Sequence, residues 1–508
     1  MSIKANTANP PRNCPPAAKI YFSDYFDVPP EALADYGAFN VSPVVDLPLF
    51  VDPFLLFTSN KPKYKALHEE IIRYLKFLRD KSSQSAMSPG ELKAWYCFHE
   101  VKQNCLGFCE TGNKGIGLGV GFAKTLSSSL HSLFNDFGEE KVTKGSHLEK
   151  LMLISGGVGR DKISDFTTNL IKGFLVKYTE TFAAKHVPSR LLRRVAVSHV
   201  EFDYEIGAWK SGHFDLPWFD DDFVLLTPEE ILTKDDTWIN KEDLRRDFPQ
   251  IRACVENDAL RAQIDNYFRS VLQSDKDKEP TRKQENEAIE ATLRRFPQLV
   301  DYYIRFKEDN GDAAIERSRR KVAEVDLRFI QNIGALAHQL SLNTGFYLTP
   351  ETTLDEAKER VSYLKHVIEN QDGYRMFYGS DGTPIEREKD LQIAFKLVCV
   401  GSPSSVDAEV NNGRGPVDFK FSRGAHDKTL IEFKLAGNAK LEQNLEHQVA
   451  VYEKANRTAQ SLKVILFFTA SEQFKVQRIM KKLQLTEEAG VVLIDARRDN
   501  KPSASNAT

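Results

Sequence analysis

The stretch at residues 462–469, Leu-Lys-Val-Ile-Leu-Phe-Phe-Thr, constrains the fold of this 508-residue chain more than any other. It is nearly all apolar and has the length of a single β-strand. Amphipathic helical patterns lie before it, at residues 441–455, and after it, at residues 471–484. A continuously apolar strand has to be covered on both faces. We therefore expect the end of the chain to fold as a sheet between layers of helices.

Further elements of this sheet are indicated on both sides of that stretch. An amphipathic helix is predicted at residues 385–400, and glycine-containing turns separate the strands that follow it. Strands are predicted at residues 404–410, 416–422, 428–436 and 490–496. The order α-β-β-β-α-β-α-β predicts an α/β fold with a mixed sheet and helices on both faces.

The rest of the chain is too long to share one core with this sheet, so the prediction is a multidomain protein. A helix start is predicted at Ser88-Pro89-Gly90-Glu91, with residues 91–106 helical. Residues 163–186 are expected to form one long helix starting near Ser164 or Asp165, and residues 213–218 an acidic turn. The predicted parts are a disordered tail (1–17), an N-terminal α/β domain (18–245), a helical connector (246–380), a C-terminal domain (381–498) and a second disordered tail (499–508).

Composition excludes some classes of protein. The net charge of −3 argues against a polycation that coats nucleic acid, so any such contact needs a local basic surface. Six cysteines without a CxxC pair are typical of reduced thiols in the cytoplasm. Neither a signal peptide nor an apolar run of about 20 residues is present. We expect a cytoplasmic protein without a membrane partner; a homo-oligomer or a protein partner, bound through the N-terminal or helical region, stays open.

Charged residues interrupt two of the predicted strands. Asp418 lies in Gly-Pro-Val-Asp-Phe, and Glu432 and Lys434 lie in Ile-Glu-Phe-Lys. Residues two apart on a strand share a face, and burying such charges is unfavourable unless they meet partners. A divalent cation and a phosphate are suitable partners. We expect Asp418, Glu432 and the backbone carbonyl of Phe433 to hold Mg²⁺, with Mn²⁺ as a substitute, and Lys434 to orient water or neutralise phosphate charge.

This pattern resembles the PD-(D/E)XK superfamily of restriction-endonuclease-like nucleases. That family carries an acidic residue after a proline, then (D/E)-x-K on the neighbouring strand; here Val417 separates Pro416 from Asp418. The resemblance covers about a quarter of the chain. It implies an αβββαβ core, Mg²⁺-dependent hydrolysis of phosphodiester bonds, and DNA as the substrate and partner.

Other positions match the same family. Gln448 and Tyr452 form a QxxxY pattern similar to that of its RecB-like and Cas4-like branches, where it lies beside the site and the DNA. Many members carry a glutamate on the helix before the first strand that helps to organise the metal, and Glu388, with Gln392 one turn later, has this position. Glu409 competes for that role. Phosphate contacts beside the site are expected from Asn411, Asn412, Arg414 and Lys440.

Several interpretations stay open. E-x-K alone is common, so a surface salt bridge on an ordinary α/β domain is one alternative. Another is a nuclease fold without activity that serves as a DNA-binding or sensor subunit. A third is a repair or recombination nuclease. We expect a DNA endonuclease whose long accessory region selects substrate, holds a partner or keeps the nuclease inactive, as in prokaryotic restriction or antiviral defence.

Overall fold

The computed structural model describes most of the chain. The tail predicted at residues 1–17 lies outside the described residues, as does most of the tail predicted at 499–508. The described residues are 19–84, 87–107, 117–133, 140–154, 158–234, 236–272, 280–337, 352–370, 373–379, 382–399, 402, 404–411, 416–423, 427–446, 460–486 and 490–501.

The C-terminal part contains the five-stranded mixed sheet that the sequence predicts. Its spatial order is β10-β9-β8-β7-β6, with β6, β7 and β8 antiparallel and β8, β9 and β10 parallel. Every strand begins and ends within two residues of its predicted bounds. The strands are β6 (Ser405–Asn411), β7 (Pro416–Arg423), β8 (Asp427–Leu435), β9 (Gln460–Phe467) and β10 (Val491–Asp495).

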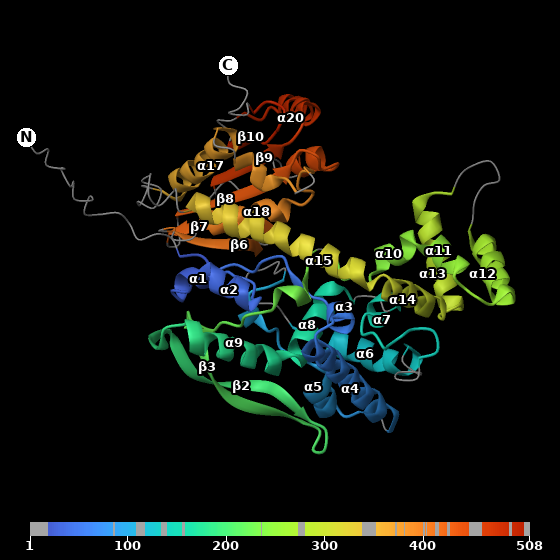
Figure 1. Ribbon diagram of the computed structural model, residues 1–508. Helices are drawn as coiled ribbons and strands as arrows, with labels where there is room; N and C mark the ends of the chain where they lie inside the picture. The colour runs from blue at the N-terminus through green and yellow to red at the C-terminus, as the bar shows by residue number, and fades with distance from the viewer. Residues whose placement is uncertain are drawn as a thin grey trace, which may run out of the picture.

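Helices cover both faces of this sheet (Figure 1). On one face lie α17 (Thr353–Asn370) and α18 (Glu388–Val398), packed against strand residues such as Phe433 and Val464. On the other lie α20 (Ala470–Lys482) and helical residues 441–446, packed against Ile465 and Phe467. Successive strand side chains alternate between faces, so an apolar run such as β9 supplies both cores.

The N-terminal region is also mixed α/β, and a long antiparallel ribbon of β2 and β3 packs on α9 at its edge (Figure 1). Short pairings of β1 with β5 and of β3 with β4 complete its strands. Its elements are α1 (Phe22–Tyr25), α2 (Pro30–Tyr36), β1 (Phe50–Val51), α3 (Pro53–Thr58), α4 (Pro62–Gln84), α5 (Pro89–Tyr96), η1 (Lys102–Asn104), α6 (Val120–Leu133), α7 (Lys150–Ile154), α8 (Arg160–Leu170), α9 (Lys172–His186), η2 (Ser189–Leu191), β2 (Leu192–Asp203), β3 (Ala208–Phe219), β4 (Asp222–Phe223), η3 (Glu229–Ile231) and β5 (Leu232–Thr233).

Local predictions here were right at one helix start and wrong elsewhere. Ser88 and Glu91 form the predicted capping box. The helix nevertheless ends at Tyr96, because the next residues are extended and Phe98 forms a β-bridge with Leu118. The prediction of one helix over 163–186 is wrong: α8 and α9 meet at Ile171, where the backbone leaves the helical region.

The predicted helix cap and the predicted acidic turn are also wrong. Ser164 lies inside α8, where its hydroxyl accepts a hydrogen bond from the N–H of Val51 at 3.0 Å. Residues 213–218 belong to β3. Asp215 is tolerated there because it faces Arg194 across the ribbon, at 2.9 Å. The turn was predicted because an acidic residue interrupts the apolar pattern, but an acidic residue can lie in a strand when a cation faces it on the neighbouring strand.

A group of helices follows the N-terminal region and packs around a second apolar cluster, which includes Phe248, Leu299 and Tyr303 together with Phe54 and Leu153 of the N-terminal region. The helix α15 and the π-helical turn η4 together run from this group to the C-terminal sheet (Figure 1). No described helix is long and apolar enough to span a membrane. The elements are α10 (Lys241–Arg246), α11 (Phe248–Ala253), α12 (Asp258–Val271), α13 (Arg282–Arg295), α14 (Leu299–Asp309), α15 (Gly311–Val325), η4 (Asp326–Asn332) and, just before α18, the 3-10 turn η5 (Gly373–Phe377).

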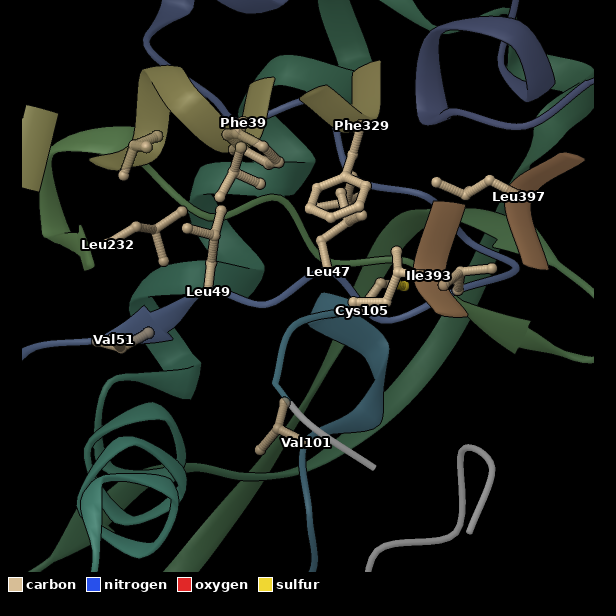
Figure 2. Close-up of a cluster of buried hydrophobic side chains, with 14 of the residues drawn as sticks. Phe39, Leu47, Leu49, Val51, Val101, Cys105, Leu232, Phe329, Ile393 and Leu397 are labelled. Carbon is tan, nitrogen blue, oxygen red and sulfur yellow. The ribbon is translucent and has the colours of Figure 1, made fainter. Parts of the chain in front are cut away.

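The largest hydrophobic cluster is shared by the N-terminal and C-terminal parts. It runs from Ile20 to Ala496 and includes residues from both sides of the predicted boundaries at 245 and 380. Figure 2 shows Ile393 and Leu397 of α18 pointing into the same cluster as Leu47. The helix α17, which the predicted boundary assigns to the connector, packs on four strands of the C-terminal sheet. The division into domains stays a prediction, but the parts are joined by a common core.

A buried ion-pair network fixes α17 to this sheet. The carboxylate of Glu356 accepts hydrogen bonds from Arg360, Arg423, Ser402 and Ser404. Burial alone would raise the pKa of Glu356, but these four partners outweigh it and hold the pKa below its ordinary value. The network therefore stabilises the fold only while Glu356 is ionised.

We predict that Glu356→Gln lowers the free energy of unfolding at pH 7 by about 3–5 kcal/mol, because the buried guanidinium groups lose their counter-charge. Since the folded-state pKa is lowered, this stabilisation is present above the unfolded-state value and is lost as the pH falls through the folded-state value. Thermal unfolding at several pH values measures both effects. Glu359→Gln, at an exposed position of the same helix, is the control. Equal losses in the two variants would contradict the prediction.

Candidate active site

The candidate site lies where β8 runs beyond its pairing with β7. The pairing reaches Phe419 opposite Ile431, and β8 continues to Leu435. The N–H of Phe433 donates to the Asp418 carboxylate instead of to a strand carbonyl, and the N–H of Leu435 donates to Glu388 at 3.2 Å. Buried N–H groups need acceptors. Two carboxylates thus take the place of the departing strand, which fixes both at one end of β8.

The helix α18 supplies two of the predicted side chains. Glu388 is in its first turn, where a carboxylate is favoured by the helix dipole, and Gln392 follows on the same face. Gln392 hydrogen-bonds Asp418. The second oxygen of Glu388 lies 3.3 Å from Nζ of Lys434. The predicted pair on this helix therefore contacts both the aspartate and the lysine of the predicted motif.

Glu432 and Lys434 lie on the sheet face that carries α20. Glu432 is only 6% exposed, and Lys434 is largely buried. In the register of β8 and β9, Glu432 pairs with Lys463, a second buried lysine. Asp418 immediately precedes the last paired residue of β7, Phe419, and its carboxylate reaches the N–H of Phe433 on β8. Strand geometry thus brings the charged residues of three strands together.

The charges at this site act on one another. Burial, and the nearby Glu388, raise the pKa of Asp418, while Lys434, the Phe433 N–H and Gln392 oppose that rise. For Lys434, burial alone would lower the pKa. The carboxylates of Asp418, Glu388 and Glu432 outweigh burial and hold its pKa above the ordinary value. Lys434 therefore keeps its positive charge.

The donor set fits a hard divalent cation that retains water. Three carboxylates (Asp418, Glu388 and Glu432) and two ammonium groups (Lys434 and Lys463) act on one another at the site. Within the described residues, no three His, Cys, Asp or Glu side chains converge enough to hold a metal on their own. Mg²⁺ is commonly held by one or two carboxylates and several waters, so it suits this set better than a metal that needs a closed cage.

The other residues predicted at the site lie in a turn or outside the part of the chain that the structure describes. Lys440 is exposed in the turn after β8, and its backbone N–H donates to Asn438. Gln448, Tyr452, Asn412 and Arg414 lie outside the described residues, and the side chains of Glu409 and Asn411 are not described either.

Three residues at the site were missed by sequence reasoning. Asn438 donates to Glu388 at 3.2 Å, and Lys475 of α20 donates to the carbonyls of Ala436 and Asn438 at 2.8 Å. Neither has a distinctive sequence signal. Lys463 does have one: it is the single charge in the apolar run of β9, and the argument used for Glu432 and Lys434 applies to it equally.

We predict that Glu388→Ala destabilises the protein by about 1–3 kcal/mol, because the Leu435 N–H loses its acceptor. Glu388→Gln should cost less, since its amide oxygen can still accept that bond. Melting temperatures of the purified variants measure the difference. Glu31→Ala, at an exposed glutamate in the first turn of α2, is the matched control. A Glu388→Ala protein that melts like this control would refute the capping role.

Two family models match the chain. The model described as Domain of unknown function (DUF8370) matches residues 27–240, and the one described as Domain of unknown function (DUF8371) matches residues 353–470. The second match begins at α17 and includes Glu388, Asp418, Glu432 and Lys434. No curated protein and no solved structure shows significant similarity to the chain. The chain is thus similar to two domain families for which these descriptions state no activity.

Proposed function

We propose that the protein is a Mg²⁺-dependent nuclease that hydrolyses phosphodiester bonds in DNA, with Asp418, Glu432 and Lys434 at its active site. The observation that carries the proposal is the arrangement at the end of β8. There an aspartate from β7 bonds to the backbone of Phe433, between a buried glutamate and a charged lysine. The order of strands and helices supports a restriction-endonuclease-like core.

Asp418 and Glu432 would hold the ion, together with the carbonyl of Phe433. In a β-strand, the N–H and C=O of one residue point to the same side. Since the Phe433 N–H donates to Asp418, its carbonyl is directed to that side as well. A bound Mg²⁺, or Mn²⁺ in its place, polarises the phosphate and makes a bound water more acidic.

The other side chains prepare the site for a phosphate. Lys434 holds its proton and can neutralise negative charge that develops on the scissile phosphate. Glu388 accepts bonds from Leu435 and Asn438 and lies beside Lys434, which supports a positioning role for it ahead of the tentative role of metal ligand. Gln392 holds Asp418 in the same way.

Cations on α20, which packs on the sheet face that carries Glu432 and Lys434, support DNA as the substrate. Lys475 connects α20 to the turn after β8. Arg478 and Lys481 are exposed on the same helix, and Phe474 is 70% exposed. Cations beside an exposed aromatic ring suit a phosphate backbone and an unpaired base. The N-terminal region would select substrate or regulate cutting, in keeping with a proposed role in restriction or antiviral defence.

We predict that metal affinity falls as the pH is lowered. This fall should begin at a higher pH than it would for an aspartate with an ordinary pKa. The raised pKa of Asp418 keeps this carboxyl protonated over a wider range, and the cation has to displace that proton. Calorimetric titration with Mn²⁺ between about pH 5 and pH 8 should show affinity increasing with pH and proton release on binding. In Asp418→Asn, binding should be weak at every pH. Equal affinity in both proteins would exclude Asp418 as a ligand.

The purified chain, with Mg²⁺ or Mn²⁺, is expected to cut circular as well as linear DNA, since we propose an endonuclease. Glu432→Ala and Lys434→Ala should each reduce the rate by about 10²-fold or more, because the first removes a ligand of the ion and the second removes a positive charge at the reacting phosphate. Lys428→Ala, at the opposite end of β8, is the control and should cut like the wild type.

Other outcomes distinguish the alternatives. Cutting that persists in both active-site variants means that the assignment is wrong. Cutting of linear DNA alone indicates an exonuclease, and strong preference for branches or ends favours a repair enzyme. A wild type that binds DNA and Mn²⁺ but never cuts supports the DNA-binding or sensor subunit.

A further inference from the structure

The helix α18 has two faces with different partners. Glu388 and Gln392 are four residues apart and face the candidate site. Asp390 lies midway between them, about 200° around the helix from each, since each residue turns an α-helix by about 100°. Its side chain is therefore directed away from the site, although it belongs to the same helical turn.

Asp390 is held by two buried cations from earlier parts of the chain. Its carboxylate lies 2.5 Å from Nη1 of Arg328 and 3.6 Å from Nζ of Lys234. The exposed fraction of each of the three residues is between 4% and 7%. Lys234 follows β5 in the N-terminal region, and Arg328 lies in η4. A buried charge without its partner is strongly destabilising, so moving either cation away from this carboxylate is energetically unfavourable.

Apolar contacts extend the same face of α18. Ile393 and Leu397 follow Asp390 at helical spacing, and both belong to the large shared cluster. Figure 2 shows them pointing into that cluster with Leu47 and Cys105 of the N-terminal region. The helix therefore packs on the N-terminal region along much of its length.

The cations themselves are held in place by the N-terminal region. Arg328 comes from a π-helical turn, and the carbonyl of the next residue, Phe329, accepts a hydrogen bond from the hydroxyl of Tyr21. The carbonyl of Leu232, two residues before Lys234, accepts a hydrogen bond from Ser318 of α15. Movement of the N-terminal region would thus move both cations relative to α18.

We propose that the N-terminal region positions α18, and thereby Glu388 and Gln392, through the attachment of Lys234 and Arg328 to Asp390. Lys234 and Arg328 are positioning residues for the site. The catalytic consequence rests on the proposed nuclease function; the structural consequence does not. A ligand or partner that shifts the N-terminal region would then change cutting without touching the DNA-binding surface.

The structural consequence is tested first, on the full chain without metal or DNA. Hydrogen–deuterium exchange is measured at α18 and at the end of β8, where the Leu435 N–H depends on Glu388. Lys234→Met and Arg328→Met should speed exchange there by about tenfold, a typical size for coupling between sites. The conservative variants Lys234→Arg and Arg328→Lys should restore slow exchange.

The matched control is Lys307→Met, which removes the cation of an equally buried pair with Asp243, 2.5 Å away, beside an apolar cluster that is separate from the one containing α18. It should leave exchange at α18 and β8 as in the wild type. If Lys234→Met and Arg328→Met behave like this control, the positioning role is overturned. If one of these variants does not fold, the other, compared with Lys307→Met, decides the question, because each removes one of the two cations of Asp390.

Cleavage kinetics then test the catalytic consequence. Lys234→Met and Arg328→Met should lower kcat about tenfold or more while KM for DNA stays within about twofold, because positioning is lost and the DNA-binding surface is kept. Faster exchange in a protein that never cuts DNA would retain the positioning role and reject the nuclease. Wild-type kcat in both variants, with unchanged exchange, would reject the positioning role and retain the nuclease.

Discussion

The structure at the candidate site depends on one requirement: the N–H groups at the end of β8 need acceptors where β7 turns away. If the first residues of β7 were paired with β8 as well as with β6, their carbonyls would close the gap. Instead, the carboxylates of Asp418 and Glu388 accept these bonds, from Phe433 and Leu435. The need to satisfy the backbone thereby holds two acids within reach of Lys434. Fold stability and chemistry use the same bonds.

The position of α18 follows from this arrangement and from the shared core. One face of the helix provides Glu388 and Gln392, and the other provides Asp390 with the apolar residues that follow it. The same helix therefore contacts the sheet on one face and the N-terminal region on the other. A separate module on a flexible linker would leave the candidate site unaffected by its position, whereas here both regions contact the same helix.

Sequence reasoning was most successful for the C-terminal sheet because each strand there is marked by apolar residues and bounded by turns. The same patterns placed Glu388 and Gln392 on the helix that contacts Asp418. Sequence reasoning failed where contacts with residues far away in the chain determine the local structure. The cross-strand partner of Asp215 turns an apparent loop into β3, and the burial of Asp390 depends on a lysine 156 residues earlier, a separation that no local pattern can reveal.

The π-helical turn η4 has a consequence for how the chain tolerates change. A π turn holds one residue more than an α turn, and here it lies between α15, which packs on the N-terminal region, and the segment that approaches the C-terminal sheet. Because a turn of either kind closes about one revolution, deleting one residue would restore a regular helix with little net rotation of one side relative to the other. The turn therefore accommodates one additional residue without rotating the two sides against each other, so related chains with or without that residue can keep the same arrangement.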